Sequence, residues 1–315
     1  KLAGRTAACW GREYTFGDLG LPEAIRSTQP EPTRGEATVD LLAGPVSLRI
    51  EGLAGPIKVS GKTPRLRQES EASVGVVAEG KAGALRIRTT GTLEYDGFYT
   101  FTVRVEPRQP VEVRSIRLEV ALPDHLACLF NASGEGMRGN KAFLDLEGLP
   151  DGVLWDSIES NVVNDGAGQK RVRVRRDEDI GNFYPHLWLG DDDRGLAFMG
   201  DSTRGWVLDE GRPCQDLIRE AGRTVLRLHL VNTAVTLHDP VEAVLSLQAT
   251  PVRPRPAGGS WRNVEWYGWG HFDEAVLWHN CFQPYKDGGL PAKNGPWYRT
   301  PEAKERNLWW RYFCF

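Results

Sequence analysis

A short link, GDDDRG at residues 190–195, places three carboxylates and one arginine between two apolar pieces. The flanking pieces, LWL at 187–189 and LAFM at 196–199, are too short for helices and long enough for buried strands. Aspartate bonds its own backbone and glycine supplies positive φ, so the link is predicted to be the turn of a hairpin. Its carboxylates could accept sugar hydroxyls, coordinate calcium, or form a solvated turn with one Asp–Arg pair.

Calcium is the least favoured of these readings, because the D-x-[DN]-x-[DN]-G spacing is absent and adjacent side chains of an extended chain point apart. Aromatic residues surround the hairpin, and aromatic faces stack on the apolar face of a sugar ring. The candidate glycan-binding residues of this stretch are Trp188, Asp192, Asp193, Arg194 and Trp206. No metal site is predicted.

A second aromatic cluster lies at residues 261–285, in WRNVEWYGWGHFDEAVLWHNCFQPY. Trp269 and His271 are its candidate glycan contacts. Helix or interface contacts explain the cluster as readily, because large aromatic side chains also dominate protein cores and interfaces.

The sequence contains no motif for nucleophilic catalysis, zinc binding or phosphate binding. The six histidines are scattered, neither G-x-S-x-G nor H-E-x-x-H occurs, and the five cysteines include no C-x-x-C. No glycine-rich phosphate loop follows a strand and opens a helix, so no cofactor is predicted. His229 lies on an alternating strand and is expected to be structural. No catalytic residue is therefore assigned.

Strands must position these side chains. ALRIRTT at 84–90, FTVRVEP at 101–107 and VEVRSIRLEVALP at 111–123 alternate apolar and polar residues, as half-buried antiparallel strands do. We predict a mainly β fold, a large antiparallel two-sheet sandwich of the supersandwich kind over residues 1–256. A short, Trp-rich and partly helical C-terminal appendage is expected over residues 257–315, after the linker-like VRPRPAGGS.

Composition excludes two classes of partner. The 315 residues carry a formal net charge of −3, which gives no electrostatic basis for binding nucleic acid. No apolar run approaches the ~20 residues of a membrane-spanning helix. The eleven tryptophans are expected mainly in the β core.

The same strand-and-turn phrases resemble a known family. WLGDDDRGLAFMGDSTRGW, followed by VLRLHLVNTAVTL and LSLQATPVRPRP, is similar to the N-terminal β-sandwich region of glycoside hydrolase family 123-like proteins. CWGREYTFGDLG, LLAGPVSL and DGFYTFTVRVEP look like earlier parts of that region, so the resemblance covers roughly residues 8–256. It implies a non-catalytic sandwich that precedes a (β/α)-barrel and supports or binds a glycan, of the N-acetylhexosamine or galactose type.

The resemblance also implies an adjacent Asp-Glu pair, with Glu as acid/base and Asp orienting the N-acetyl group. Asp273 and Glu274 are such a pair, but they lie at the start of the region where a barrel would begin, whereas the family's pair lies well inside it. About 55 residues follow the linker, against the about 250 of a barrel. The role is therefore not carried over, and this chain alone is expected to lack glycosidase turnover.

The end of the sequence carries an alternative. Thr300-Pro301-Glu302 predicts a helix start, and Trp309, Trp310 and Phe313 would contact a downstream barrel or a second copy of the chain. A structural or assembly protein that self-associates is thus the rival function. The expected location is extracellular or periplasmic, although the opening KLAGRTAACWG contains no signal-peptide core.

Overall fold

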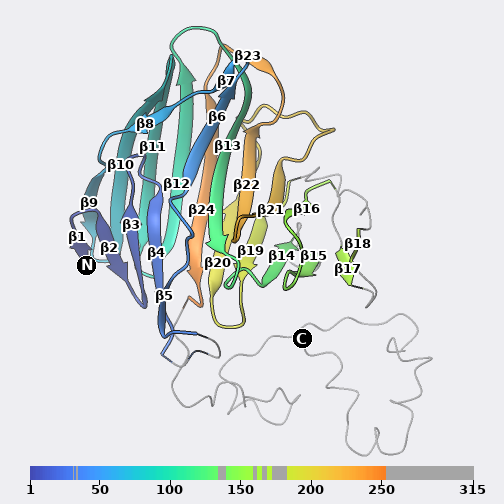
Figure 1. Ribbon diagram of the computed structural model, residues 1–315. Coiled ribbons are helices and arrows are strands. Elements are labelled where there is room, and N and C mark those ends of the chain that lie inside the picture. Colours follow the sequence, from blue (N-terminus) through green and yellow to red (C-terminus); the bar gives the residue numbers. More distant parts are fainter. Residues whose placement is uncertain are drawn as a thin grey trace, which may run out of the picture. The chain divides into compact units, whose positions relative to one another are not determined.

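The computed structural model (Figure 1) describes residues 1–30, 32, 35–133, 140–158, 162–164, 169–171 and 183–252. Most of the described residues are in strands and none of them is in a helix, so the predicted mainly β fold is confirmed. No helix among the described residues is long and apolar enough to cross a membrane.

Three larger sheets make up the described part. The five-stranded sheet runs in chain order through β1 (Leu2–Ala3), β2 (Thr6–Cys9), β3 (Arg12–Phe16), β4 (Pro22–Thr28) and β5 (Thr38–Asp40). The seven-stranded sheet has the order β16 (Gly152–Asp156), β21 (Gln215–Glu220), β22 (Arg223–Val231), β13 (Val111–Pro123), β6 (Ser47–Gly52) and β7 (Gly55–Pro56), and β23 (Val235–Leu237) also pairs with β13.

The ten-stranded sheet has the order β15 (Asn140–Asp145), β14 (Leu129–Ser133), β19 (His186–Gly190), β20 (Gly195–Gly200), β24 (Val241–Thr250), β12 (Phe98–Pro107), β11 (Leu85–Glu94), β10 (Ser73–Ala82) and β8 (Val59–Gly61), with β9 (Arg65–Ser70) also on β10. A two-stranded sheet joins β17 (Val162–Asn164) to β18 (Gln169–Arg171). All strand pairs are antiparallel, as the alternating segments predict.

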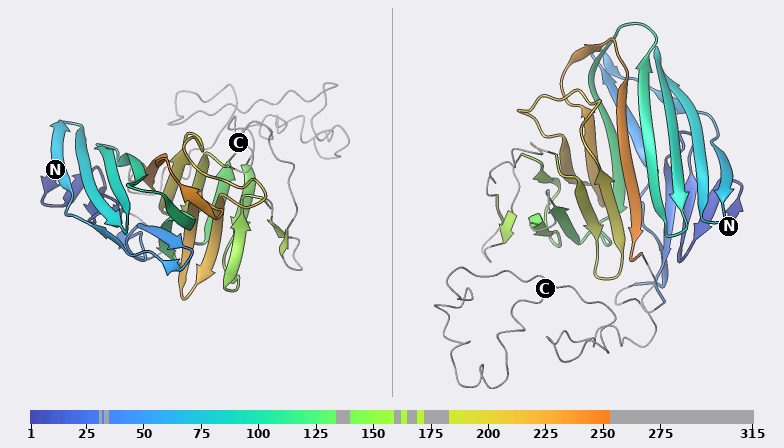
Figure 2. Two further views of the ribbon diagram at one scale, coloured as in Figure 1. Left: turned by 90° about the horizontal axis from the view of Figure 1, so that it is seen from above. Right: turned by 180° about the vertical axis from the view of Figure 1, so that it is seen from behind.

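The ten-stranded sheet forms one layer, and the five- and seven-stranded sheets share the other (Figure 2). Phe16 of β3 meets Tyr99 of β12 with ring centroids 5.0 Å apart, and Phe130 of β14 meets Trp155 of β16 at 4.9 Å. These contacts belong to one continuous apolar core. The sandwich therefore has two layers, but one layer is divided between two sheets.

The described tryptophans lie mostly outside the core, whereas the sequence predicts them mainly inside it. Among the described tryptophans only Trp155 is fully buried, whereas Trp188 and Trp206 are half-buried and Trp10 is exposed. Leucine, valine and isoleucine side chains fill most of the core instead. Three tryptophans thus lie where they can contact something other than the core.

The chain divides into two compact units, Lys1–Pro254 and Arg255–Phe315. The appendage, its predicted helix, and the predictions for Trp269, His271, Asp273, Glu274, Trp309, Trp310 and Phe313 lie outside the described residues. The sites considered below therefore belong to the first unit.

Candidate functional site

The predicted hairpin of residues 187–199 is present as β19 and β20, joined by the turn at residues 191–194. Oδ1 of Asp191 accepts the backbone N–H groups of Asp193 and Arg194, each at 2.8 Å. Nη2 of Arg194 donates to the carbonyl of Glu36 at 2.8 Å. The turn is thereby fastened to the segment before β5.

This fastening buries most of the turn. Asp191, Asp193 and Arg194 keep only 6%, 3% and 2% of their surface exposed, whereas Asp192 is exposed. The solvated turn that was one of the three interpretations of the sequence is therefore wrong for three of the turn's four charged residues. The reason is a partner about 150 residues away in the chain, which the local pattern does not reveal. Asp192 is therefore the charged side chain of this turn that a ligand could reach most easily.

Trp188 lies on the face of β19 turned away from the core. Its Nε1 donates to Oγ1 of Thr250 on β24 at 2.9 Å, so the indole spans from β19 across β20. A Cβ at Gly190 or Gly195 would come within 2.7 Å of the ring. The glycines of GDDDRG thus leave room for an indole laid against the sheet.

Polar residues flank this indole on the same face. The strand registers align Asn131 with Trp188, Trp188 with Ala197, and Ala197 with Gln248 in one row across four strands. Burial lowers the pKa of the nearby His186, which keeps its imidazole neutral at neutral pH. An aromatic surface edged by amides and a hydroxyl is suited to hold a sugar ring.

Trp206 does not join Trp188. It packs edge-to-face on Phe183, with ring centroids 5.6 Å apart, and Phe183 lies against Gly200 at the far end of β20. Five residue steps separate Gly195 from Gly200, about 17 Å along a strand. The structure therefore places Trp188 against Gly190 and Gly195, directs Arg194 to the carbonyl of Glu36, and leaves Trp206 apart.

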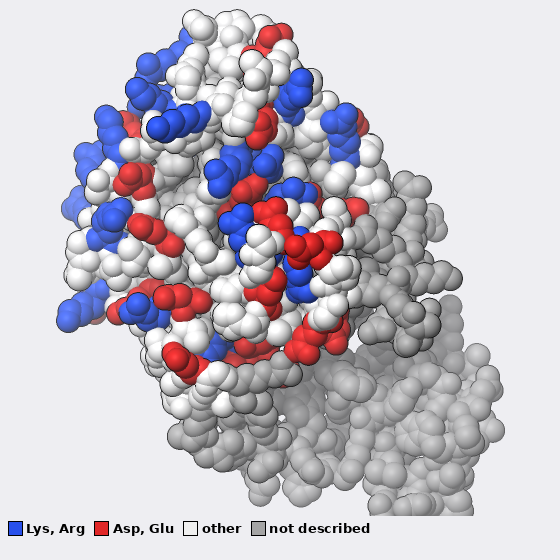
Figure 3. Space-filling model, in the orientation of Figure 1, with Lys and Arg blue, Asp and Glu red and all other residues white. Residues whose placement is uncertain are grey.

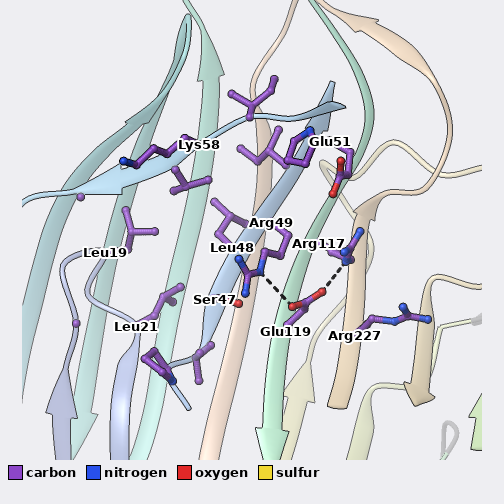
Figure 4. A pocket seen from close by; sticks show the side chains of 18 of the residues that line it. Leu19, Leu21, Ser47, Leu48, Arg49, Glu51, Lys58, Arg117, Glu119 and Arg227 are labelled. Carbon is purple, nitrogen blue, oxygen red and sulfur yellow. Dashed lines mark hydrogen bonds and ion pairs between the residues drawn. The ribbon is translucent and has the colours of Figure 1, made fainter. Parts of the chain in front are cut away.

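A groove that the sequence did not predict lies over the exposed face of the seven-stranded sheet, with a volume of about 840 Å³ (Figure 4). Arg49 on β6 and Arg117 on β13 both point at Glu119, with Nε–O distances of 3.2 and 2.7 Å. Leu19 and Leu21 form part of its apolar wall. Basic and acidic side chains are interspersed over this face of the molecule (Figure 3).

A second ion-paired group lies on the neighbouring strands β21 and β22 of the same sheet. Asp216 on β21 accepts from Nε of Arg227 at 2.5 Å and faces Nε2 of His229 at 2.8 Å, both on β22. Burial acts to raise the pKa of Asp216, but the hydrogen bonds and charges of His229 and Arg227 outweigh it and lower the pKa overall. Asp216 is thus held ionised, which makes it a poor proton donor, and His229 has the structural role predicted for it.

The signal for this groove is present in the sequence as outward charges on alternating strands, R-x-E at 117–119 and R-x-H at 227–229. The register between β13 and β22 places Glu119 opposite Arg227, and these two positions are about 110 residues apart in the chain. Only the fold brings them together. Among the described residues no group of three or more His, Cys, Asp or Glu side chains could hold a metal ion. Binding through hydrogen bonds and aromatic contact is the chemistry that these surfaces offer.

Comparison with known proteins confirms the resemblance. The profile of the glycoside hydrolase 123 third domain matches residues 1–202, and no curated protein matches the chain. Among solved structures, a galactose mutarotase related enzyme from Lactobacillus acidophilus is 6% identical with a TM-score of 0.39, covering 79% of this chain and 97% of that one. An aldose epimerase homologue from C. elegans is 7% identical with a TM-score of 0.40, covering 78% and 98%.

A GH36 α-galactosidase from Geobacillus stearothermophilus, crystallised with stachyose, is 9% identical with a TM-score of 0.41. The match covers 77% of this chain and 40% of the galactosidase.

Proposed function

Because the chain belongs to the family described as glycoside hydrolase 123, third domain, we propose that it is a non-catalytic β-sandwich that supports or binds a glycan. The glycan is of the N-acetylhexosamine or galactose type. A single observation carries the proposal, namely the half-buried indole of Trp188, which lies against the sheet and is bonded to Thr250 at 2.9 Å.

The indole of Trp188 is preorganised, because contacts within the protein already hold its ring in place. Its hydrogen bond to Thr250 and its contact with Gly190 and Gly195 fix the ring, so little side-chain entropy is lost when a sugar stacks on it. Asn131, opposite Trp188 in the strand register, supplies an amide for hydroxyl or acetamido groups on the same face. Asp192 adds an exposed carboxylate at the hairpin tip.

Calorimetry on the purified chain, after a glycan array has selected ligands, tests this role. We expect Trp188→Ala to weaken binding about tenfold or more, equivalent to about 1.4 kcal/mol. Trp188→Phe keeps an aromatic face but loses the bond to Thr250, and should lose less affinity. Leu53→Ala is the control, because Leu53 is an exposed apolar residue near the seven-stranded sheet and far along the chain from this hairpin. Absence of binding on both assays, or full affinity in Trp188→Ala, contradicts the binding role.

Extracellular or periplasmic location and participation in polysaccharide degradation belong to the same proposal. Self-association through Trp309, Trp310 and Phe313 stays a prediction, to be checked by light scattering of the full chain beside a chain ending at Pro256. Equal, monomeric masses would remove its basis.

A further inference from the structure

Three hairpin turns meet at one end of the molecule and surround a cavity of about 240 Å³. They join β2 to β3, β9 to β10, and β11 to β12. Trp10 and Tyr95, from the first and third of these turns, both line the cavity. The second turn contributes Glu71.

Trp10 and Tyr95 are unusually exposed, at 52% and 59%. Single exposed apolar residues need no explanation. Here the two exposed aromatic side chains of the described residues line one cavity, and their backbones are bonded, with the N–H of Trp10 donating to the carbonyl of Tyr95 at 3.2 Å. A shared aromatic surface of this kind is a feature of binding sites.

Buried contacts beneath the aromatic pair hold the third turn in place. Arg12, only 3% exposed, donates through Nη1 to the carbonyl of Asp96 at 2.5 Å. The hydroxyl of Tyr14 donates to the carbonyl of Gly97 at 2.8 Å. Gly97 has φ of +84°, and a Cβ there would overlap Cδ of Arg12. Tyr95 is thus presented by a fixed backbone.

The polar lining indicates the class of ligand. Gln68, Glu71 and Glu94 offer planar amide and carboxylate groups that match sugar hydroxyls, while the aromatic rings match the C–H face of a pyranose. The lining carries the carboxylates of Glu71 and Glu94 beside Lys1, so it offers no excess of positive charge for an anionic ligand. Burial raises the pKa of the Cys9 thiol to about 11, so the thiol stays protonated and binding is non-covalent.

We propose that this cavity binds one neutral pyranose residue against Trp10 and Tyr95, as a second sugar contact separate from Trp188. The choice of a sugar as ligand class rests on the proposed function. The Trp188 site lies on the β19–β20 hairpin, whereas the cavity is formed by the β2–β3, β9–β10 and β11–β12 turns, so each site can be removed alone.

Titration calorimetry and saturation-transfer NMR with galactose and N-acetylgalactosamine oligosaccharides test the inference. Trp10→Ala and Tyr95→Ala should each weaken binding at this cavity at least tenfold, and the double variant should remove one site from the stoichiometry. Tyr95→Phe keeps the ring and should stay within about threefold of the unsubstituted chain. Thermal unfolding verifies that each variant is folded.

The outcomes separate this inference from the proposed function. Loss of binding in Trp188→Ala with no effect in the Trp10→Ala/Tyr95→Ala double variant overturns the cavity and leaves the Trp188 site standing. The reverse result supports the cavity and removes the Trp188 site. Choline is included as a probe, because aromatic rings with carboxylates also bind quaternary ammonium groups. Binding of choline but of no sugar, or of neither probe, overturns the inference.

Discussion

Glycine at positions 190 and 195 is required by the tryptophan that covers both. The indole of Trp188 occupies the space where side chains at these positions would project. The turn signal G-D-D-D-R-G is usually attributed to backbone conformation, yet neither glycine has a positive φ. Their small size, rather than their flexibility, is what the site uses.

Gly195→Ala is therefore expected to destabilise the fold by about 1–3 kcal/mol, because the new methyl group overlaps the carbonyl of Leu189 and the Trp188 ring. Urea unfolding followed by fluorescence would measure it as a lower midpoint. Gly44→Ala is the matched control, since a Cβ there meets nothing within 4 Å, and should stay within about 1 kcal/mol. Equal midpoints for the two variants would contradict this account of the glycines.

The sequence pattern was sufficient for the turn but not for its burial. Asp191 specifies the turn by accepting the backbone N–H groups of Asp193 and Arg194, which are local contacts. The burial of Arg194 depends on the carbonyl of Glu36, which is remote in the chain. In the same way, the row of Asn131, Trp188 and Gln248 forms only once three distant strands are in register.

At the scale of strands, alternation predicted the elements well. The segments at 84–90, 101–107 and 111–123 correspond to β11, β12 and β13, and Pro107 and Pro123 end their strands, where a missing N–H costs little. The division of one layer into two sheets was not predicted, because strand order depends on long-range pairing. β13, for example, pairs with both β6 and β22.

Asp216 links β21 to β22, and its effect on stability should depend on pH. Its pKa is lowered in the folded state, so its stabilisation is present above the unfolded value of about 3.9 and is lost as pH falls through the folded value. Asp216→Asn should cost about 1–3 kcal/mol at pH 7, since its partly buried partners Arg227 and His229 lose a charged acceptor. The difference from the unsubstituted chain should shrink as the pH falls below the unfolded value.

Chemical unfolding at a series of pH values measures this dependence. Glu220→Gln is the control, because its ion pair with Arg223 is exposed and should contribute below about 1 kcal/mol. A pH-independent difference between Asp216→Asn and the unsubstituted chain would show that the contact acts through shape rather than charge.

At the scale of the whole molecule, the two carboxylates with shifted pKa values, Asp216 and Glu79, are poor candidates for the acid of a hydrolysis reaction. A glycosidase needs a protonated acid near the leaving oxygen and a second group across the sugar. Asp216 and Glu79 instead have lowered pKa values, the first where bonds from His229 and Arg227 outweigh burial, the second through the Arg86 hydrogen bond. Paired carboxylates of this kind bind and stabilise rather than donate protons.

We therefore expect no cleavage of a nitrophenyl N-acetylgalactosaminide by this 315-residue chain. A release assay on the purified chain, with the Asp273→Asn/Glu274→Gln double variant beside it, checks this. Turnover in the chain and its loss in the double variant would refute the prediction and assign the pair a catalytic role.

The position of β24 has a mechanical consequence. This strand lies between β12 and β20 within the ten-stranded sheet, and it leads directly to the second unit. Arg12 also holds the carbonyls of Pro251 and Val252 just beyond it. Tension applied through residue 255 would act along β24, so its hydrogen bonds to both neighbours would share the load and break together. An edge strand such as β1 is hydrogen-bonded on one side only, so bonds to a single neighbour would oppose the same pull.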